Sequence, residues 1–420
     1  MNILILGAGG REHALAWAIK QNPKCAALYV APGNAGIAAM TTCIDLDILD
    51  GNAVAKFAAE HEIELVIIGP EAPLAAGVAD ICRAAGLTVF GPSKAAAQLE
   101  SSKSFTKAIC DAASAPTAAW AQFSSAAPAK AYIEAKGAPI VIKADGLAAG
   151  KGVTVAMSKS EALAAIDDCF SGFHGAAGAE VVIEVFMEGE EASYFLLVDG
   201  TDIVAIGTAQ DHKRAYDGDK GPNTGGMGAY SPAPVLSDSI AAAAMAEIIR
   251  PTMEEMAHRG MPYQGVLYAG LMIKDGKARL VEYNCRFGDP ECQVLMMRLG
   301  AQALDLIHAA AEGRLDTIKP HWADDHAVSI VMATNGYPGN YEKGSIINGL
   351  ETIAETSHQA VFHAGTVEND GAIRASGGRV LGITARGDTL KQAQEKAYAL
   401  TGQIDWPEGF YRKDIGWRAL

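Results

Sequence analysis

The sequence has little positive charge, no closely spaced cysteines and no long hydrophobic run. It holds 34 Lys and Arg against 49 Asp and Glu. The resulting net charge of −15 excludes the broad basic surface of a general nucleic-acid-binding protein, although it allows a local basic pocket for a small anion. The seven cysteines include no C-x-x-C pair, which excludes a zinc knuckle or a redox pair and favours free thiols in a reducing compartment.

Targeting and membrane-spanning segments are not indicated either. The N-terminus has no basic stretch followed by a cleavable apolar segment. One of the longest uncharged windows, Cys25–Ile44, contains Pro32-Gly33-Asn34 and therefore does not read as a membrane helix. We expect a cytoplasmic protein that binds neither nucleic acid nor a membrane.

The composition that remains is that of a globular protein with several domains. The chain has 420 residues, of which 50% are hydrophobic and 20% are charged, and this length predicts about three domains. Over residues 1–100, short apolar runs alternate with helical patterns, which predicts a doubly wound parallel-sheet α/β domain. The predicted strands are 2–6, 28–30, 65–68 and 88–90, and the predicted helices are 11–20, 52–61 and 74–85. Three of these strands end in Gly- and Pro-rich loops (7–10, 32–36 and 69–73), which we expect to share one rim of the sheet.

The rest of the chain predicts α+β units followed by a small α/β unit. The predicted strands are 140–143, 153–157, 181–186, 193–198, 204–210, 265–274, 278–284, 327–332 and 379–385. The predicted helices are 160–170, 239–258, 301–312 and 390–404.

The first glycine-rich loop, Gly7 to Glu12, begins like a dinucleotide-binding fingerprint. Glu12 stands where that fingerprint needs its third glycine, which argues against an NAD-dependent oxidoreductase. The loop still precedes a helix whose free N–H groups suit a phosphate or a carboxylate. A plain strand-to-helix turn is the alternative.

A second glycine-rich loop follows Lys143 at the end of a strand. Gly146, Gly150 and Gly152 leave backbone N–H groups free to approach phosphate oxygens, and Lys151 adds a charge. The spacing is not that of a Walker loop. The alternative, a solvated hairpin tip, is disfavoured because the loop is too long for a tight turn.

Glu282 and Asn284 lie on one face of a predicted strand, because side chains alternate with a period of two. Two hard oxygen donors beside bound phosphates suit Mg²⁺. The alternative is a solvent-facing strand, which the closely following Arg286, Asp289 and Glu291 make less favourable.

Two further segments suggest ligand contacts. The loop Gly221–Gly228, preceded by Gln210-Asp211-His212-Lys213-Arg214, reads as an anion clamp, with an irregular surface loop as the alternative. The segment Glu184–Met187, with Glu191 after it, could offer backbone groups to an adenine and a carboxylate to a ribose, although alone it would be an ordinary strand end.

Taken together, these motifs resemble the glycinamide ribonucleotide synthetases (phosphoribosylamine–glycine ligases), which are ATP-grasp enzymes of de novo purine synthesis. The resemblance covers essentially the whole chain, and IVIKADGLAAGKGV (140–153) and GPNTGGMGAYSPAP (221–234) are its most specific stretches. It implies a two-lobed ATP-grasp core between an N-terminal Rossmann-like domain and a small C-terminal α/β domain. The implied units are 1–105, 106–190, 191–323 and 324–420.

The family also implies the chemistry: ATP phosphorylates the carboxylate of glycine to glycyl phosphate, and the amine of 5-phosphoribosylamine then attacks it. The expected cofactor is Mg²⁺ or Mn²⁺, and transient contact with neighbouring purine-pathway enzymes is expected. Another ATP-grasp carboxylate–amine ligase and a non-catalytic nucleotide-binding module are the alternatives.

The site residues follow from the resemblance, motif by motif. Those implied for ATP are Lys107, Lys143, Gly146, Gly150, Lys151, Gly152, Glu184, Val185, Phe186 and Glu191. Those implied for the other substrates are Gly9, Gly10, Arg11, Glu12, Pro32, Gly33, Asn34, Asp211, Lys213, Asn223, Gly225 and Gly226. Glu282 and Asn284 match the metal ligands, and Arg286 and Asp289 are the implied catalytic residues.

Two departures from the family pattern stand out. The predicted strand Gly265–Ile273 carries no acid, so only two protein ligands to the metal are expected. Val185 stands where relatives often have Glu, which matters only if the adenine contact uses that side chain.

Overall fold

The N-terminal domain is a parallel five-stranded sheet with helices on both faces, as predicted. A computed structural model describes residues 1–146, 152–171 and 180–420. The strand order is β3 (Thr42–Cys43), β2 (Ala27–Pro32), β1 (Asn2–Gly7), β4 (Ile63–Ile68) and β5 (Thr88–Phe90). Its helices are α1 (Gly10–Lys20), α2 (Ala35–Met40), α3 (Gly51–Glu60), α4 (Glu71–Ala76) and α5 (Val78–Ala84). The period of two divides β1 between two cores, since Ile3 and Ile5 pack with α1 whereas Leu4 and Leu6 pack with α3 and α5.

One predicted helix of this domain is wrong. The segment 74–85 is not a single helix, because Gly77 adopts a left-handed conformation with φ of +91° and separates α4 from α5.

The three glycine-rich loops of the N-terminal domain lie together, as predicted. Gly7 pairs with Pro32 in the sheet, the Gly33 N–H donates to the Gly7 carbonyl, and the Gly69 N–H donates to the Leu6 carbonyl. The carboxylate of Glu12 fills the space between these loops, so a side-chain carbon at Gly7 or Gly69 would collide with it. This explains why glutamate here replaces the glycine of a dinucleotide fingerprint.

A small lobe follows α6 (Gln98–Ser101) and α7 (Lys103–Ala112). Its antiparallel sheet has the order β6 (Trp120–Phe123), β9 (Val181–Val185), β7 (Ile140–Ala144) and β8 (Val153–Ala156). The helices α8 (Ala126–Lys136) and α9 (Lys159–Phe170) pack on it through a separate core. β6 and α8 were not predicted, because their Ala-, Ser- and Pro-rich sequence has no clear period.

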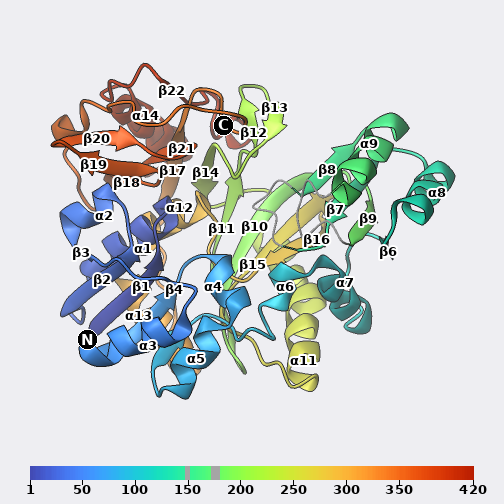
Figure 1. Ribbon diagram of the computed structural model, residues 1–420, viewed down its shortest axis with the longest axis horizontal. Coiled ribbons are helices and arrows are strands. Elements are labelled where there is room, and N and C mark those ends of the chain that lie inside the picture. Colours follow the sequence, from blue (N-terminus) through green and yellow to red (C-terminus); the bar gives the residue numbers. More distant parts are fainter. Residues whose placement is uncertain (147–151, 172–179) are drawn as a thin grey trace.

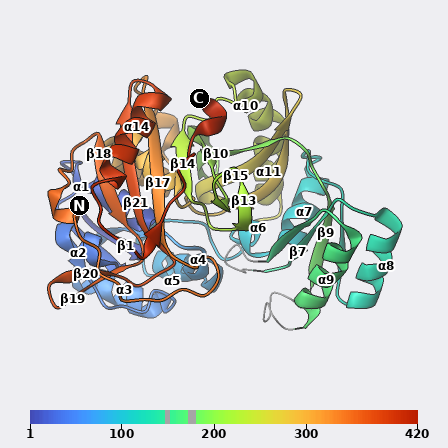
Figure 2. The same ribbon diagram turned by 90° about the horizontal axis from the view of Figure 1, so that it is seen from above.

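The largest sheet runs through the middle of the molecule and continues into the C-terminal part (Figures 1 and 2). Its order is β16 (Lys277–Asn284), β15 (Gln264–Lys274), β10 (Glu190–Asp199), β11 (Ile203–Asp211), β14 (Gly228–Ser231), β17 (His326–Thr334), β21 (Arg379–Gly387) and β18 (Gln359–His363), with β22 (Gly409–Phe410) paired to β17. Because β14 pairs with β17, the two units predicted to meet at residue 324 share one hydrogen-bonded sheet.

Helices and hairpins complete these two parts. The helices are α10 (Asp238–Ala244), a π-helical turn (Met245–Ile249), α11 (Arg250–His258), α12 (Glu291–Leu299), α13 (Gln302–Ala311) and α14 (Leu390–Thr401). The hairpins are β12 (Arg214–Tyr216) with β13 (Lys220–Asn223), and β19 (Thr366–Asn369) with β20 (Ala372–Ala375). In Figure 1 the N-terminal domain (blue) and the C-terminal part (orange to red) lie on the left and the small lobe (teal to green) on the right.

Helices α12 and α13 join the N-terminal domain to the large sheet, since both belong to the core that contains α1 and half of β1. Within the described residues, no single helix is long and apolar enough to cross a membrane. Together α12 and α13 would meet that criterion by length and composition, but the pair bends by 108°.

A pair of histidines, the buried His13 and the half-buried His363, links the N-terminal domain to the C-terminal part. The His363 N–H donates to His13 Nδ1 at 2.8 Å, which requires that nitrogen to be unprotonated. Burial lowers the pKa of His13 to about 3, with the nearby His363 adding to the effect, and burial lowers the pKa of His363 to about 4. Both pKa values fall below the ordinary value for histidine, so both side chains are neutral in the folded protein at neutral pH.

We expect this pair to make the fold sensitive to mild acid. Because the folded-state pKa values are depressed, the stabilisation is complete above the unfolded-state pKa near 6.5 and is lost as the pH falls toward the folded-state values. The loss between about pH 6.5 and about pH 5 is up to about 2 kcal/mol per histidine. The test is to measure the melting temperatures of the wild type and His13→Gln over this pH range. If melting temperature depended on pH equally in both proteins, the expected acid sensitivity of the histidine pair would be contradicted.

Candidate active site

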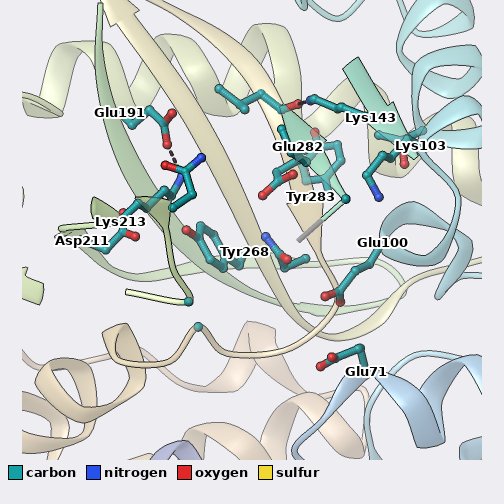
Figure 3. A pocket seen from close by; sticks show the side chains of 18 of the residues that line it. Glu71, Glu100, Lys103, Lys143, Glu191, Asp211, Lys213, Tyr268, Glu282 and Tyr283 are labelled. Atoms are coloured by element: carbon teal, nitrogen blue, oxygen red, sulfur yellow. Dashed lines mark hydrogen bonds and ion pairs between the residues drawn. The ribbon is translucent and has the colours of Figure 1, made fainter. Parts of the chain in front are cut away.

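A cavity of about 540 Å³ lies where the N-terminal domain, the small lobe, the large sheet and the C-terminal part meet. Figure 3 shows its charged lining, with Lys103, Lys143 and Glu282 in one group and Asp211, Lys213 and Glu191 in another. The described residues that line it come from segments more than 350 positions apart, from Arg11 to Arg379.

At one end, Glu184 lies between two buried lysines. Its carboxylate is 3.1 Å from Lys107 Nζ and 2.8 Å from Lys143 Nζ, and all three side chains are 3–4% exposed. The register of β7 on β9 accounts for this contact, because Glu184 lies opposite Val141 and Lys143 is two residues further along the same face. Burial lowers the pKa of Lys107, with Lys143 adding to the effect and Glu184 opposing it. Two buried lysine ammonium groups therefore lie side by side at this end of the cavity, and one carboxylate, that of Glu184, pairs with both.

Glu282 and Asn284 on β16 both line the cavity, as the period of two predicts. Within the described residues, the carboxylate of Glu282 forms no hydrogen bond or ion pair. Burial by itself would raise its pKa, but Lys143, Lys213, Lys103 and Arg286 outweigh burial and lower it. Glu282 thus keeps an anionic carboxylate that no other described side chain binds directly.

Unlike Glu282, Asn284 already has a hydrogen-bond partner, since its Oδ1 accepts a hydrogen bond from Arg286 Nη2 at 3.1 Å. Over the parts of the chain that the structure describes, no three His, Cys, Asp or Glu side chains gather as a metal cluster. The two hard oxygen donors fit an ion such as Mg²⁺ that takes its remaining ligands from substrate phosphates and water.

Arg286 and Asp289 follow directly after these donors. Arg286 lies 3.0 Å from a carboxylate oxygen of Glu100 and 3.4 Å from one of Glu71. Asp289 accepts hydrogen bonds from Gln293 Nε2 at 2.8 Å and from the Arg11 N–H at 3.4 Å. Asp289 thereby connects the loop after β16 to the N-terminal domain.

On another wall, Lys213 pairs with Glu191 beside Asp211 and Tyr268. Burial raises the pKa of Asp211 to about 7, with Glu291 and Glu191 adding to the rise and Lys213 opposing it. Tyr268 donates a hydrogen bond to Glu291 at 3.0 Å. This wall therefore holds acidic groups that could accept an ammonium or a proton.

His212, between Asp211 and Lys213, does not line the cavity. It is buried, and its Nε2 accepts a hydrogen bond from the Gly416 N–H near the C-terminus. It is a structural histidine.

The end of β9 and the segment after it border the cavity through Val185, Phe186 and Met187. The Val185 N–H already donates to the carbonyl of Ala119, and its side chain is 47% exposed. The Val185 N–H is therefore already engaged within the protein and is not free for an adenine.

Most of the predicted site residues line this cavity. They are Arg11, Lys107, Lys143, Gly146, Gly152, Glu184, Val185, Phe186, Glu191, Asp211, Lys213, Asn223, Gly225, Glu282, Asn284, Arg286 and Asp289. Those that do not line it are Gly9, Gly10, Glu12, Pro32, Gly33, Asn34 and Gly226. Gly150 and Lys151 lie outside the described residues.

The predicted residues outside the lining mostly support it. Glu12 binds the Arg11 guanidinium at 2.5 Å and accepts the Gly9 N–H at 2.6 Å. Asn34 caps α2 and donates to the carbonyls of Ala8 and His363. These contacts shape the N-terminal loops rather than face the cavity.

Several lining residues were not predicted as site residues: Glu71, Glu100, Lys103, Tyr268 and Arg379. Lys103 and Arg379 lie within conspicuous motifs, SSKSFTK (101–107) and GGRVL (377–381), but a motif alone does not show which of its side chains faces a cavity. Tyr268 lies in an apolar strand pattern and carries no signal of its own.

Comparison with known proteins gives one family over the whole chain. Models of the phosphoribosylglycinamide synthetase N domain, ATP-grasp (A) domain and C domain match residues 1–100, 101–292 and 327–418. A phosphoribosylamine–glycine ligase of Mesorhizobium japonicum is 59% identical over 100% of this chain and 99% of its own length. A chloroplastic one of Arabidopsis thaliana is 54% identical over 98% of this chain and 79% of its own length.

Solved structures agree. The phosphoribosylamine–glycine ligase of Thermotoga maritima superposes with a TM-score of 0.85 at 32% identity, covering 99% of this chain and 100% of that one. Biotin carboxylase of Campylobacter jejuni superposes with a TM-score of 0.74 at 15% identity, covering 98% of this chain and 92% of that one, a likeness of fold alone.

Proposed function

The chain belongs to the phosphoribosylglycinamide synthetase family, and on this premise we propose how its cavity joins glycine to 5-phosphoribosylamine. As a member of that family it is an ATP-dependent ligase of purine biosynthesis, a phosphoribosylamine–glycine ligase. The observation that carries the proposal is the convergence of Lys107, Lys143, Glu282 and Asn284 on one cavity.

A carboxylate does not acylate an amine in water near neutral pH, so the carboxylate of glycine must first be activated. We infer that the γ-phosphoryl group of ATP passes to a glycine oxygen, giving glycyl phosphate and ADP. The amine of phosphoribosylamine then attacks the carbonyl carbon, the C–O bond to phosphate breaks, and the amine loses a proton. This chemistry needs positioning and charge neutralisation more than covalent help from the protein.

The two lysines bound to Glu184 would hold the phosphates of ATP. Gly146 and Gly152, at the two ends of the glycine-rich loop, would approach the same phosphates. Glu191 and the backbone of Phe186 would hold the ribose and the adenine. Glu282 and Asn284 would hold Mg²⁺ or Mn²⁺, which when bound supplies charge neutralisation for the phosphates.

Arg286 and Asp289 would position the reacting groups next to those donors. Arg11, Asp211, Lys213, Asn223 and Gly225 would face glycine and phosphoribosylamine. The acidic wall around Asp211 suits the ammonium group of glycine and the proton that the attacking amine releases.

Replacing Lys143 by Ala tests the phosphate assignment. A charge-assisted hydrogen bond contributes roughly 1.5–3 kcal/mol, so kcat/KM for ATP should fall about ten- to a hundredfold or more. Lys136→Ala, an exposed lysine of the same lobe, is the matched control and should keep wild-type kinetics. Wild-type turnover in Lys143→Ala would refute the assignment.

The overall function is tested by coupled ADP release with Mg·ATP, glycine and phosphoribosylamine, omitting one component at a time. ADP release should require all of them. Turnover with another carboxylate but not with glycine, or tight ATP binding without turnover, would contradict the function.

Residues 1–105, 106–190, 191–323 and 324–420 are our proposed domain divisions. We also propose a cytoplasmic setting, which the free state of all seven cysteines supports. Because phosphoribosylamine is short-lived, transient contact with neighbouring enzymes of the same pathway would favour its delivery.

A further inference from the structure

The cations that line the cavity differ in how well carboxylates neutralise them. Glu184 pairs with Lys107 and Lys143, Glu12 with Arg11, Glu100 with Arg286, and Glu191 with Lys213. Two cations stand apart. Among the described residues Lys103 forms no ion pair and donates to the Gly146 carbonyl, and Arg379 approaches a carboxylate only at 3.9 Å, to Asp289 Oδ1.

Arg379 is also held in an unusual way. Its Nη1 donates to the carbonyls of Gly225, Gly226 and Asp289, which fixes the guanidinium between the glycine-rich loop and the turn after β16. A side-chain carbon at Gly225 would lie 2.9 Å from the guanidinium carbon, so glycine there permits this close approach. The side chain is 23% exposed and borders the cavity.

This arrangement leaves one edge of the guanidinium without an acceptor. Within the described residues, neither Nε nor Nη2 of Arg379 forms a hydrogen bond. A fixed guanidinium edge with free donors matches the geometry of a phosphate or a carboxylate.

We propose that Arg379 of the C-terminal domain binds the 5-phosphate of phosphoribosylamine. This inference rests on the proposed function, which supplies the substrate. The anion could in principle belong to glycine instead, but the carboxylate of glycine must meet the γ-phosphoryl group beside Lys107, Lys143 and Glu282. In the large sheet, β15, β10, β11, β14 and β17 lie between β16, which carries Glu282, and β21, which carries Arg379. The ribose of phosphoribosylamine separates its phosphate from its reacting amine, which suits an anion site away from the lysines.

The test compares Arg379→Met and Arg379→Lys with the matched control Arg374→Ala, an arginine of the same domain that donates to the Gly344 carbonyl and does not line the cavity. Ribose 5-phosphate, which carries the same phosphate monoester, is titrated into each protein, with unphosphorylated ribose as the second probe. KM values for phosphoribosylamine, glycine and ATP are then measured for each protein.

We expect Arg379→Met to weaken ribose 5-phosphate binding and to raise KM for phosphoribosylamine by roughly ten- to a hundredfold. Its KM values for glycine and ATP should stay within about threefold, because those substrates bind at the other cations. Arg379→Lys keeps the positive charge but loses the planar pair of guanidinium donors, so its affinity for ribose 5-phosphate and its KM for phosphoribosylamine should lie between those of Arg379→Met and the wild type. Ribose binding should be the same in all proteins.

Three results would overturn the proposal. The first is unchanged ribose 5-phosphate affinity in Arg379→Met. The second is a selective rise in KM for glycine, which would assign the anion to the glycine carboxylate. The third is loss of the folded state in both variants, which would make Arg379 a structural residue. Failure of the proposed function is distinguishable, since the wild type would then release no ADP with glycine and phosphoribosylamine.

Discussion

Replacing Glu184 by Gln is expected to destabilise the ATP-free protein by about 3–5 kcal/mol, because it removes the carboxylate from a buried lysine pair and leaves two uncompensated charges. Both lysines are nearly inaccessible to water, so neither can recover its lost partner by solvation. The triphosphate of ATP can replace the missing negative charge. Mg·ATP should therefore raise the melting temperature of Glu184→Gln by more than it raises that of the wild type, even though turnover is reduced.

The matched control is Glu134→Gln in the same lobe. Glu134 pairs with Lys159 at 2.8 Å, but both side chains are about half exposed, and such surface pairs contribute about 0–1 kcal/mol. Thermal unfolding of both variants, with and without Mg·ATP, provides the measurement. A Glu184→Gln protein as stable as Glu134→Gln would show that the two lysines are not held by this carboxylate.

The contact between Glu184 and the lysines also shows where sequence reasoning stops. The resemblance implied that Lys107, Lys143 and Glu184 all contact one nucleotide, with Glu184 at the adenine. Its actual partners depend on the register of β9 on β7, two strands about 40 residues apart, which local patterns do not define.

Periodicity succeeded where one face of a strand decides the outcome. Glu282 and Asn284 were predicted to share a face, and they line one cavity. Periodicity failed to predict α12, because nearly all of its residues are buried and no polar face marks a helical period. A short apolar run of this kind does not distinguish a helix from a strand. Glu71 and Arg379 lie in segments that stand out in the sequence, the loop 69–73 and the motif 377–381, but only tertiary packing decides that these two side chains face the cavity.

Glu282→Gln is expected to lower kcat/KM by more than about a hundredfold, which exceeds the usual effect of removing a supporting residue of a metal site. The substitution preserves the shape of the side chain but removes the charge that we propose holds the metal. Raising the concentration of Mg²⁺ or Mn²⁺ should recover only part of the activity, because Asn284 remains as a weaker, neutral donor. Glu60→Gln, an exposed acid on α3, is the control and should behave as the wild type.

The binding of metal-free ATP separates a lost metal site from a damaged pocket. Lys143, Lys213, Lys103 and Arg286 keep the pKa of Glu282 low, so in the wild type its negative charge opposes a bare triphosphate. Glu282→Gln removes that repulsion and leaves the cations in place. Calorimetric titration without divalent metal should therefore show the variant binding ATP at least as tightly as the wild type, while titration with Mg·ATP should show weaker binding. If the variant lost affinity for metal-free ATP as well, Glu282 would be organising the cavity rather than carrying the metal.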